Sequence, residues 1–193
     1  MTPGDAPPSS AGTGRLESRP VYDGRIVRLS LDTVRFPDGT TGELEMIRHR
    51  GASCVLPVFG DLGDPDPDIL LVHQYRYASD GFLFEVPAGI PDSADETWEA
   101  CARRELEEET GHRAGRLHPL TRIYTTPGFT DEVIHLFAAT ELTPGDADLD
   151  VDEFIEVVRM PFSRAVELIR TGELVDAKSV ACLLYAKSFL LAG

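Results

Sequence analysis

The stretch ARRELEEETGH, residues 102–112, decides how this chain folds, because it is dense in glutamate and nearly devoid of apolar residues. If it is a helix, Glu105 and Glu109 lie four residues apart on the same side of it. Like charges at that spacing repel each other by roughly 0.2–0.5 kcal/mol. Something in the folded protein must therefore compensate for this pair.

A helical wheel at about 100° per residue indicates where these carboxylates point. The side predicted to pack inward carries Trp98, Cys101, Ala102, Glu105 and Glu109. Glu108 lies at the edge of that side, whereas Glu107 faces the opposite way. The wheel therefore predicts carboxylates at positions where apolar side chains are expected.

Two interpretations of this pattern are open. A solvated acidic face is the usual meaning of a run of charge, and it explains Glu96 and Glu107. It explains Glu105 and Glu109 poorly, because desolvating unpaired carboxylates is very unfavourable. A bound divalent cation removes the difficulty, since hard ions such as Mg2+ take oxygen ligands. The residues therefore favour a metal site on the inner face of this helix.

Cap and turn residues divide the rest of the chain into elements. Ser93, with Glu96 three residues later, forms a capping box that predicts the start of the helix, and Gly111 predicts its end. Further helices are predicted over 163–170, before Gly172, and over 176–191. The predicted strands cover residues 25–36, 40–50, 53–59, 68–76, 82–86, 120–125, 133–139 and 154–160, with a hairpin turn at Asp38-Gly39. Many strands with few helices indicate an α+β sandwich.

The domain organisation predicted from composition is simple. Residues 1–19, rich in Pro, Gly, Ser and Ala, are expected to be a disordered tail. Residues 20–193 are expected to form a single domain whose first part, 20–50, is an N-terminal antiparallel β subdomain. The strands at 53–59 and 68–76 are continuously apolar, which predicts burial on both faces.

Composition also bounds the compartment and the partners. The net charge of −15 opposes binding to nucleic acid or to an anionic membrane. Cys54, Cys101 and Cys182 are far apart in apolar surroundings, which predicts buried reduced thiols. No apolar run reaches the length of a membrane span, and no secretory signal is evident, so we expect a cytoplasmic protein.

The segment GIPDSADETWEACARRELEEETGH, residues 89–112, resembles the Nudix box. The positions that match the box are Gly89, Glu96, Arg104, Glu105, Leu106, Glu108, Glu109 and Gly111. Two positions depart from it: the loop between Gly89 and Glu96 is one residue longer than is common, and His112 replaces an apolar residue. Neither departure moves the glutamates out of register, so the resemblance is specific.

The resemblance implies a Nudix-type α/β/α sandwich with a mixed sheet, and a hydrolase that uses Mg2+ or Mn2+. By position, the metal ligands are the Ala88 carbonyl, Glu105, Glu108 and Glu109. Arg104 is implied to orient a glutamate by a charge-assisted bond. Glu96 is implied to hold the box together.

Segments outside the box resemble the ADP-ribose pyrophosphatase-like subfamily. In VHQYRYASDGFLFEVPAG, residues 72–89, Arg76 takes the place of an arginine that reaches a substrate phosphate, and Glu85 is implied to bind substrate. Arg48 is a further candidate for a substrate contact, with Arg50 as its alternative. An arginine that merely ends a surface strand is the alternative for Arg76.

The segment YTTPGFTDEVIHLFAATEL, residues 124–142, resembles the loop and strand after the box in the same subfamily. The resemblance makes Glu132 the candidate base that activates water, or a support for the metal. The alternative is that Asp131 and Glu132 cap a strand and stay solvated. Glu153 and Glu156 are candidates for the site or for a solvent-facing strand.

The implied reaction is Mg2+-dependent hydrolysis of ADP-ribose to AMP and ribose 5-phosphate. The alternatives are another nucleoside diphosphate sugar, of the GDP-mannose or UDP-glucose type, and a ligand-sensing Nudix module that does not catalyse. The subfamily also suggests a homodimer in which the N-terminal strands of each subunit pack on the other. No tryptophan occurs in these strands to stack on a base, because Trp98, the only one, lies on the box helix.

Overall fold

The computed structural model describes residues 12–148 and 154–191, and the chain within them forms two units. The smaller unit comprises the chain up to His49 together with Thr126–Glu132. The larger unit comprises Arg50–Thr125 and the chain from Val133 onward. The division between the units falls between His49 and Arg50, and residues 126–132 return to the smaller unit, for which the sequence carried no signal.

The larger unit is built on two sheets. Its strands are β4 Ala52–Pro57, β5 Asp68–Arg76, β6 Gly81–Glu85, β7 Ala88–Gly89, β8 His112–Tyr124, β9 Val133–Pro144 and β10 Ile155–Pro161. One sheet has the order β7-β4-β9-β8 and the other has the order β10-β5-β6. The β4–β9 pair is parallel, and the other pairs are antiparallel. The prediction of a mixed sheet is confirmed.

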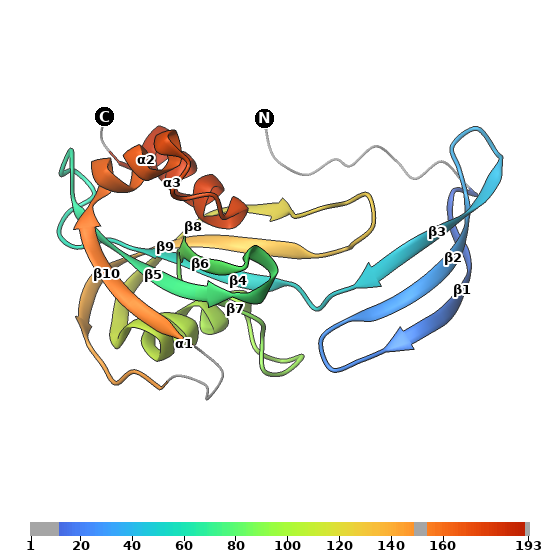
Figure 1. The fold of residues 1–193 in the computed structure, drawn as a ribbon, viewed down its shortest axis with the longest axis horizontal. Coiled ribbons are helices and arrows are strands. Elements are labelled where there is room, and N and C mark those ends of the chain that lie inside the picture. The colour runs from blue at the N-terminus through green and yellow to red at the C-terminus, as the bar shows by residue number, and fades with distance from the viewer. Residues whose placement is uncertain (1–11, 149–153, 192–193) are drawn as a thin grey trace. The chain divides into compact units, whose positions relative to one another are not determined.

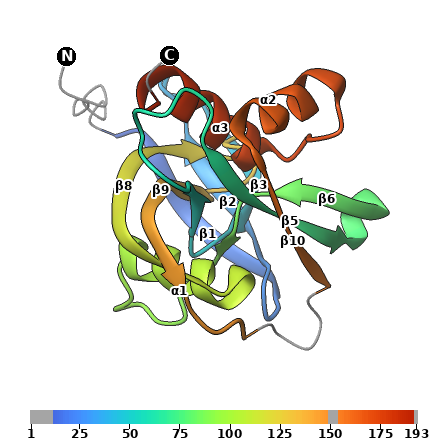
Figure 2. The same ribbon diagram turned by 90° about the vertical axis from the view of Figure 1, so that its left-hand side faces the viewer.

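Three helices cover the strands of the larger unit. They are α1 Trp98–Thr110, α2 Phe162–Thr171 and α3 Ala177–Phe189, and the short 3-10 helix η1 Tyr77–Ser79 joins β5 to β6. Figures 1 and 2 show α1 on one side of the strands and α2 with α3 on the other. This arrangement is the predicted α/β/α sandwich of the α+β class.

The core has two parts, one on each side of the four-stranded sheet. Cys54 and Leu56 of β4 belong to the larger cluster, which includes residues of α2 and α3. Val55, between them in sequence, packs with Ala102 and Leu106 of α1. Successive side chains of a strand point to opposite faces, so β4 contributes to both clusters. This confirms the predicted burial of β4 on both faces.

The smaller unit is an antiparallel sheet of β1 Gly14–Asp23, β2 Arg28–Arg35 and β3 Thr41–Arg48 in sequence order. Its β2–β3 turn contains the predicted Asp38-Gly39. The Asp38 carboxylate accepts the Thr40 backbone N–H at 2.9 Å, and Gly39 adopts a φ of 87° that other residues rarely tolerate. The predicted hairpin is confirmed.

The predicted disordered tail, residues 1–19, is wrong from Gly14 onward, because β1 begins there. All ten residues of β1 are exposed, so burial of side chains does not order this segment. It is ordered by backbone pairing with β2, from Gly14 opposite Arg35 to Asp23 opposite Arg28. Residues 1–11 lie outside the described part of the chain.

The start of α1 also differs from the prediction. Thr97, not Ser93, is the N-cap, and its hydroxyl accepts the Ala100 N–H at 3.1 Å. Glu96 accepts the Asp92 N–H at 2.7 Å and so orders the loop instead of capping the helix. Gly111 ends α1 in the left-handed conformation, as predicted. The predicted ends of α2 at Gly172 and the start of α3 at Asp176 are confirmed.

Two predictions from composition can be compared with the structure. The cysteines Cys54, Cys101 and Cys182 are buried and free of disulfides, as predicted. Burial, reinforced by the negative charge of Glu105, raises the pKa of Cys101 to about 11. In the described part of the chain, no helix has the length and apolar character that a membrane crossing requires.

Candidate active site

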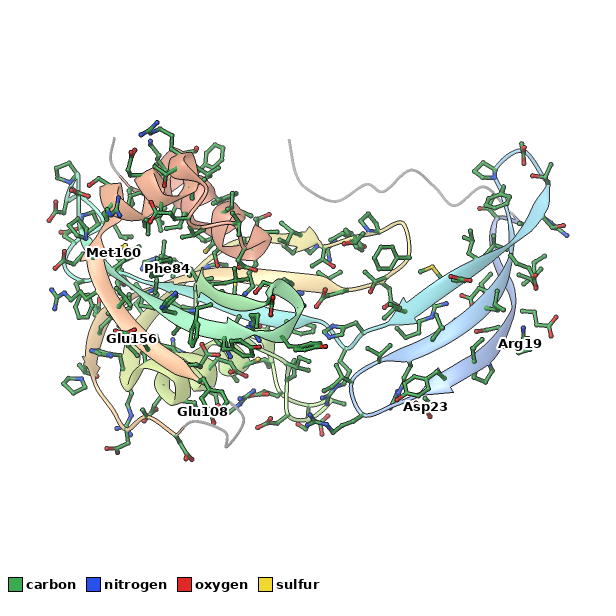
Figure 3. The ribbon with its side chains drawn as sticks, viewed as in Figure 1. Arg19, Asp23, Phe84, Glu108, Glu156 and Met160 are labelled. Carbon is green, nitrogen blue, oxygen red and sulfur yellow. The ribbon has the colours of Figure 1, made fainter. Side chains whose placement is uncertain are left out.

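The inner face of α1 carries the two carboxylates that the wheel placed there. Glu105 and Glu109 are 8% and 3% exposed, and they share their side of the helix with buried Cys101, Ala102 and Leu106. The predicted inward orientation of both glutamates is confirmed. Glu108 projects from the edge of the same helix (Figure 3) and is half-buried.

The short strand β7 lies directly against these carboxylates. The backbone N–H of Ala88 donates to Oε2 of Glu109 at 3.3 Å. A Cβ atom at Gly89 would overlap the carboxylate of Glu105, so only glycine allows the backbone to approach this closely. The Cys101 thiol donates to the Gly89 carbonyl at 3.5 Å and holds the strand on the helix.

Arg104 neutralises part of the negative charge. Its Nη1 donates to Oε1 of Glu105 and to Oε2 of Glu108, each at 2.8 Å. Its Nε donates to Glu96 at 3.0 Å, and its Nη2 donates to the Ile90 carbonyl at 3.1 Å. Burial acts to lower the pKa of Arg104, but the surrounding carboxylates outweigh it and raise the pKa. Arg104 therefore joins the loop before α1 to two of the predicted metal ligands.

The donor set fits a hard divalent cation. Carboxylate and carbonyl oxygens are the ligands that Mg2+ and Mn2+ prefer, and Glu105, Glu108, Glu109 and the Ala88 carbonyl offer only oxygen. In the conformation that the structure describes, no three acidic, histidine or cysteine side chains of residues 12–148 and 154–191 converge into a ready metal cluster. Arg104 lies between Glu105 and Glu108 in this conformation.

A second buried charge network surrounds Arg76 at the end of β5. Glu85 of β6 is 2% exposed and accepts Nε and Nη2 of Arg76 at 2.7 and 2.8 Å. Lys178 of α3 also bonds to Glu85, and it bonds to Asp176 at 3.0 Å. The two carboxylates thus balance two cations. Arg76 keeps 41% of its side chain exposed, whereas Glu85 is sequestered behind it.

The charges of this network shift its pKa values in opposite directions. Burial acts to raise the pKa of Glu85, but hydrogen bonds from Arg76 and the charge of Lys178 outweigh it and hold the pKa below its ordinary value. Burial acts to lower the pKa of Lys178, whereas Asp176 and Glu85 raise it above its ordinary value. Each group is therefore ionised near neutral pH.

Two other predicted site residues lie in the smaller unit. Arg48, at the end of β3, bonds to Asp32 and, at 3.2 Å, to Asp131. Glu132 is half-buried, and its Oε1 lies 3.3 Å from Nδ1 of His49. The Glu132 side chain is thus 26% exposed and that of Asp131 is 41% exposed.

The two candidates on and before β10 differ in outcome. Glu156 is an exposed residue of β10 (Figure 3), as the solvent-facing alternative expects. Its carboxylate lies 3.9 Å from Nδ1 of His73. Glu153 lies outside the described residues.

Sequence reasoning missed Lys178, Asp176 and Asp32. Lys178 lies in the first turn of α3 with 11% of its side chain exposed. Its only local signal is the N-cap Asp176, whose carboxylate accepts the Ser179 N–H at 3.0 Å. Asp32 occupies an inward position of a strand whose other inward position is Ser30. Polar residues at inward positions occur in both α1 and β2. In α1 this pattern predicted a functional site, and in β2 the same pattern marks Asp32.

Comparison with known families assigns both units. Residues 48–182 match the family model described as NUDIX domain. Residues 15–43 match the model described as nucleoside diphosphate sugar hydrolase N-terminal domain. The two matches together span most of the described chain.

Individual relatives match over most of their length. The chain is 36% identical over 167 residues to the ADP-ribose pyrophosphatase of Bacillus subtilis (strain 168), covering 86% of this chain and 87% of the relative. It is 40% identical over 159 residues to the GDP-mannose pyrophosphatase of Salmonella paratyphi B, covering 75% and 81%. It is 33% identical over 172 residues to the methanol dehydrogenase activator of Bacillus methanolicus, covering 88% and 90%.

A solved structure supports the fold. The chain matches the crystal structure of an ADP compounds hydrolase with a TM-score of 0.78, over 94% of this chain and 96% of that one. The identity is 22%, so this likeness establishes the fold alone.

The Arg76–Glu85–Lys178 network predicts a pH-dependent contribution to stability. Glu85→Gln is expected to lower the free energy of unfolding at pH 7 by roughly 3 kcal/mol, because it removes the buried charge that pairs with Arg76 and with the largely buried Lys178. The folded pKa of Glu85 lies below its ordinary value of 4.5. The contribution is therefore complete above about pH 4.5 and is lost as the pH falls through the folded pKa.

Urea unfolding of the wild type and of Glu85→Gln between pH 7 and pH 3 measures the difference between their free energies of unfolding, here called the gap. Exposed Glu156→Gln is the control, with an expected effect within about 0.5 kcal/mol. A gap for Glu85→Gln that stays constant down to pH 3 would contradict the electrostatic origin.

Proposed function

Because the chain belongs to the NUDIX family, we propose that it hydrolyses the pyrophosphate bond of ADP-ribose to AMP and ribose 5-phosphate, with Mg2+ or Mn2+ as cofactor. The class of enzyme does not depend on this choice of substrate. The chain is a pyrophosphohydrolase of the class that acts on ADP-ribose and nucleoside diphosphate sugars. The observation that carries the proposal is the buried pair Glu105 and Glu109, bonded to Arg104 and to β7.

The mechanism follows from the charge of the substrate. A pyrophosphate carries about two negative charges that repel an incoming nucleophile, so its hydrolysis depends on positioning and electrostatic stabilisation. A bound divalent cation supplies part of this neutralisation and lowers the pKa of a coordinated water. Glu105, Glu108, Glu109 and the Ala88 carbonyl would hold that ion, and Arg104 fixes the orientation of Glu105 and Glu108.

The chain's own cation contributes to substrate binding. Glu85 binds Nε and Nη2 of Arg76, and this bidentate pair fixes the plane of the guanidinium. The half-exposed edge of Arg76 is proposed to bind a substrate phosphate. Glu85 therefore acts on the substrate through Arg76.

Glu132 is proposed to be the general base that takes the proton from the attacking water. A carboxylate in this role must be ionised and must be held at a fixed position. Its contact with His49 and its place on a loop attached to β3 support the proposal.

A substrate panel tests the proposed activity. ADP-ribose, GDP-mannose, UDP-glucose and a dinucleoside polyphosphate would be compared by kcat/KM, with and without Mg2+. The highest kcat/KM is expected for ADP-ribose.

The match to the GDP-mannose pyrophosphatase makes a hexose nucleotide the second candidate, and a preference for a hexose nucleotide would overturn the ADP-ribose assignment. The name of the methanol dehydrogenase activator suggests action on another protein, and absence of hydrolysis on every substrate would favour a ligand-sensing role.

The metal assignment predicts a specific loss of activity. Glu109→Gln is expected to lower kcat by more than about 100-fold, since loss of even an outer partner of a metal ligand costs about 10–100-fold. Without metal, its melting temperature should be unchanged or higher, because repulsion between Glu105 and Glu109 is relieved.

The matched control for Glu109→Gln lies on the same helix. Glu107 is outside the buried side and bonds to Arg113, so Glu107→Gln should keep kcat within about two-fold. Near-normal turnover of Glu109→Gln would contradict the metal assignment.

A homodimer formed through the N-terminal strands is also proposed. Large apolar side chains are exposed on this unit, which is unusual for a surface without a partner; they are Leu16, Val21, Tyr22, Ile26, Val27 and Leu44. Light scattering after size-exclusion chromatography should give twice the chain mass of 21.1 kDa. Charged substitutions at Val21 and Tyr22 should reduce it to the chain mass, and a monomeric wild type would contradict the proposal.

A further inference from the structure

The strand β2 of the smaller unit has polar residues at its buried positions. Among the residues Arg28–Arg35, the buried ones are Ser30, at 7% exposure, and Asp32, at 2%. Burying a carboxylate is unfavourable by several kcal/mol unless it is paired and hydrogen-bonded. A well-packed apolar residue at this position would be no less stable. The carboxylate of Asp32 therefore requires an explanation beyond stability.

Asp32 bonds to side chains from all three strands of the sheet. Its Oδ1 accepts the Ser18 hydroxyl of β1 at 2.6 Å and the Ser30 hydroxyl of β2 at 3.0 Å. Its Oδ2 accepts Nη2 of Arg48 at the end of β3. The two serines hold the Asp32 carboxylate in place, and this carboxylate in turn anchors one nitrogen of the Arg48 guanidinium.

Arg48 passes this constraint to the loop that precedes β9. Its Nη1 donates to Oδ2 of Asp131 at 3.2 Å. The other oxygen of Asp131 accepts the backbone N–H of His49 at 2.8 Å. Asp131 is thus held by the side chain of one residue of the chain and by the backbone of the next. The Asp131 carboxylate therefore attaches the loop to Arg48, which is itself bonded to Asp32.

Backbone bonds complete the attachment of the loop. The Ile47 N–H donates to the Phe129 carbonyl at 2.7 Å, and the Asp131 N–H donates to the Ile47 carbonyl at 3.3 Å. Ile47 and Thr130 therefore form an isolated parallel bridge at the end of β3. This pairing explains why the loop belongs to the smaller unit although its neighbours in sequence belong to the larger one.

Glu132 is the residue directly after this attachment point. Its N–H donates to the hydroxyl of buried Thr130 at 3.2 Å, and its carboxylate lies beside His49. Thr130 and His49 belong to the two segments that Asp131 joins. The position of Glu132 consequently depends on the Asp131 carboxylate, and through Arg48 on Asp32.

We infer that Asp32 is a positioning residue for hydrolysis, which acts through Arg48 and Asp131 to hold the loop 126–132 and the carboxylate of Glu132 in place. The inference rests on the proposed role of Glu132 as the base. In this inference Arg48 links the carboxylates of Asp32 and Asp131 within the smaller unit, an arrangement that we call the relay. It replaces the substrate contact that the sequence led us to expect for Arg48. A displacement of a reacting group by about 1 Å can cost about 100-fold in rate, so such a relay has a measurable effect.

The test is a double-mutant cycle on ADP-ribose with saturating Mg2+. Asp32→Asn keeps the shape of the side chain but removes the charge that holds Arg48. It should lower kcat by about 10-fold or more and change KM by less than about two-fold. In the Glu132→Gln background, the same substitution should produce no further loss. Asp68→Asn is the matched control, because Asp68 bonds to an arginine, Arg159, at 2.9 Å on the surface of the larger unit.

Hydrogen exchange gives a readout that does not depend on activity. In Asp32→Asn, the backbone amides of Ile47 and Asp131, which bond across β3 and the loop, should exchange faster than in the wild type. Amides of α1 should keep their wild-type rates. Unchanged exchange at Ile47 and Asp131 would overturn the inference.

A second variant covers the case in which Asp32→Asn does not fold. Asp131→Asn leaves Asp32 paired with Arg48 and affects a side chain that is 41% exposed, and it should give the same loss of kcat without a change in KM. A rise in KM with kcat unchanged would instead assign Arg48 to substrate binding and overturn the relay.

The outcomes separate this inference from the proposed function. Wild-type turnover of Glu132→Gln would overturn the base assignment and the relay together. A loss from Asp32→Asn that adds in full to that of Glu132→Gln would overturn the relay alone, with the base assignment retained.

Discussion

The structure depends on one electrostatic constraint, which is the burial of like charges on the inner face of α1. Glu105 and Glu109 lie against the backbone of β7, and in this conformation the Glu105 carboxylate occupies the space that a Cβ at position 89 would need. Arg104 compensates part of the charge and joins the preceding loop to the helix. Since buried carboxylates are stable only when they are paired, the elements around α1 are arranged to supply partners to them.

The same combination of a buried acid and an arginine occurs at two other places. Glu85 fixes Arg76, and Lys178 from α3 balances the remaining charge. Asp32 fixes Arg48 in the smaller unit. In each case the acid is sequestered and the arginine is more exposed. Bidentate or multiply bonded carboxylates restrict the guanidinium, and a restricted guanidinium loses less entropy when it binds a further anion. Asp32 and Glu85 therefore act by orienting Arg48 and Arg76.

The sequence predicted the box helix and its orientation because both depend on local periodicity. Spacing of four residues places Glu105 and Glu109 on one side whatever the rest of the fold does. The start of the helix was missed because Ser93 and Thr97 are both competent caps, and the choice between them depends on how Glu96 and Arg104 order the loop. The strand β1 was missed because its residues have no buried side chains, and only the backbone of β2 orders them.

By itself the sequence determined the family, the reaction class and the inward side of α1, since each is encoded in residues close together along the chain. Only the tertiary structure decided which partners the buried acids have. Lys178 and Glu85 are 93 residues apart, and Arg48 and Asp131 are 83 apart. Such pairs depend on the docking of α3 beside β6 and on the pairing of a loop with the end of β3. No local pattern specifies these placements, because they result from packing and backbone hydrogen bonding of whole elements.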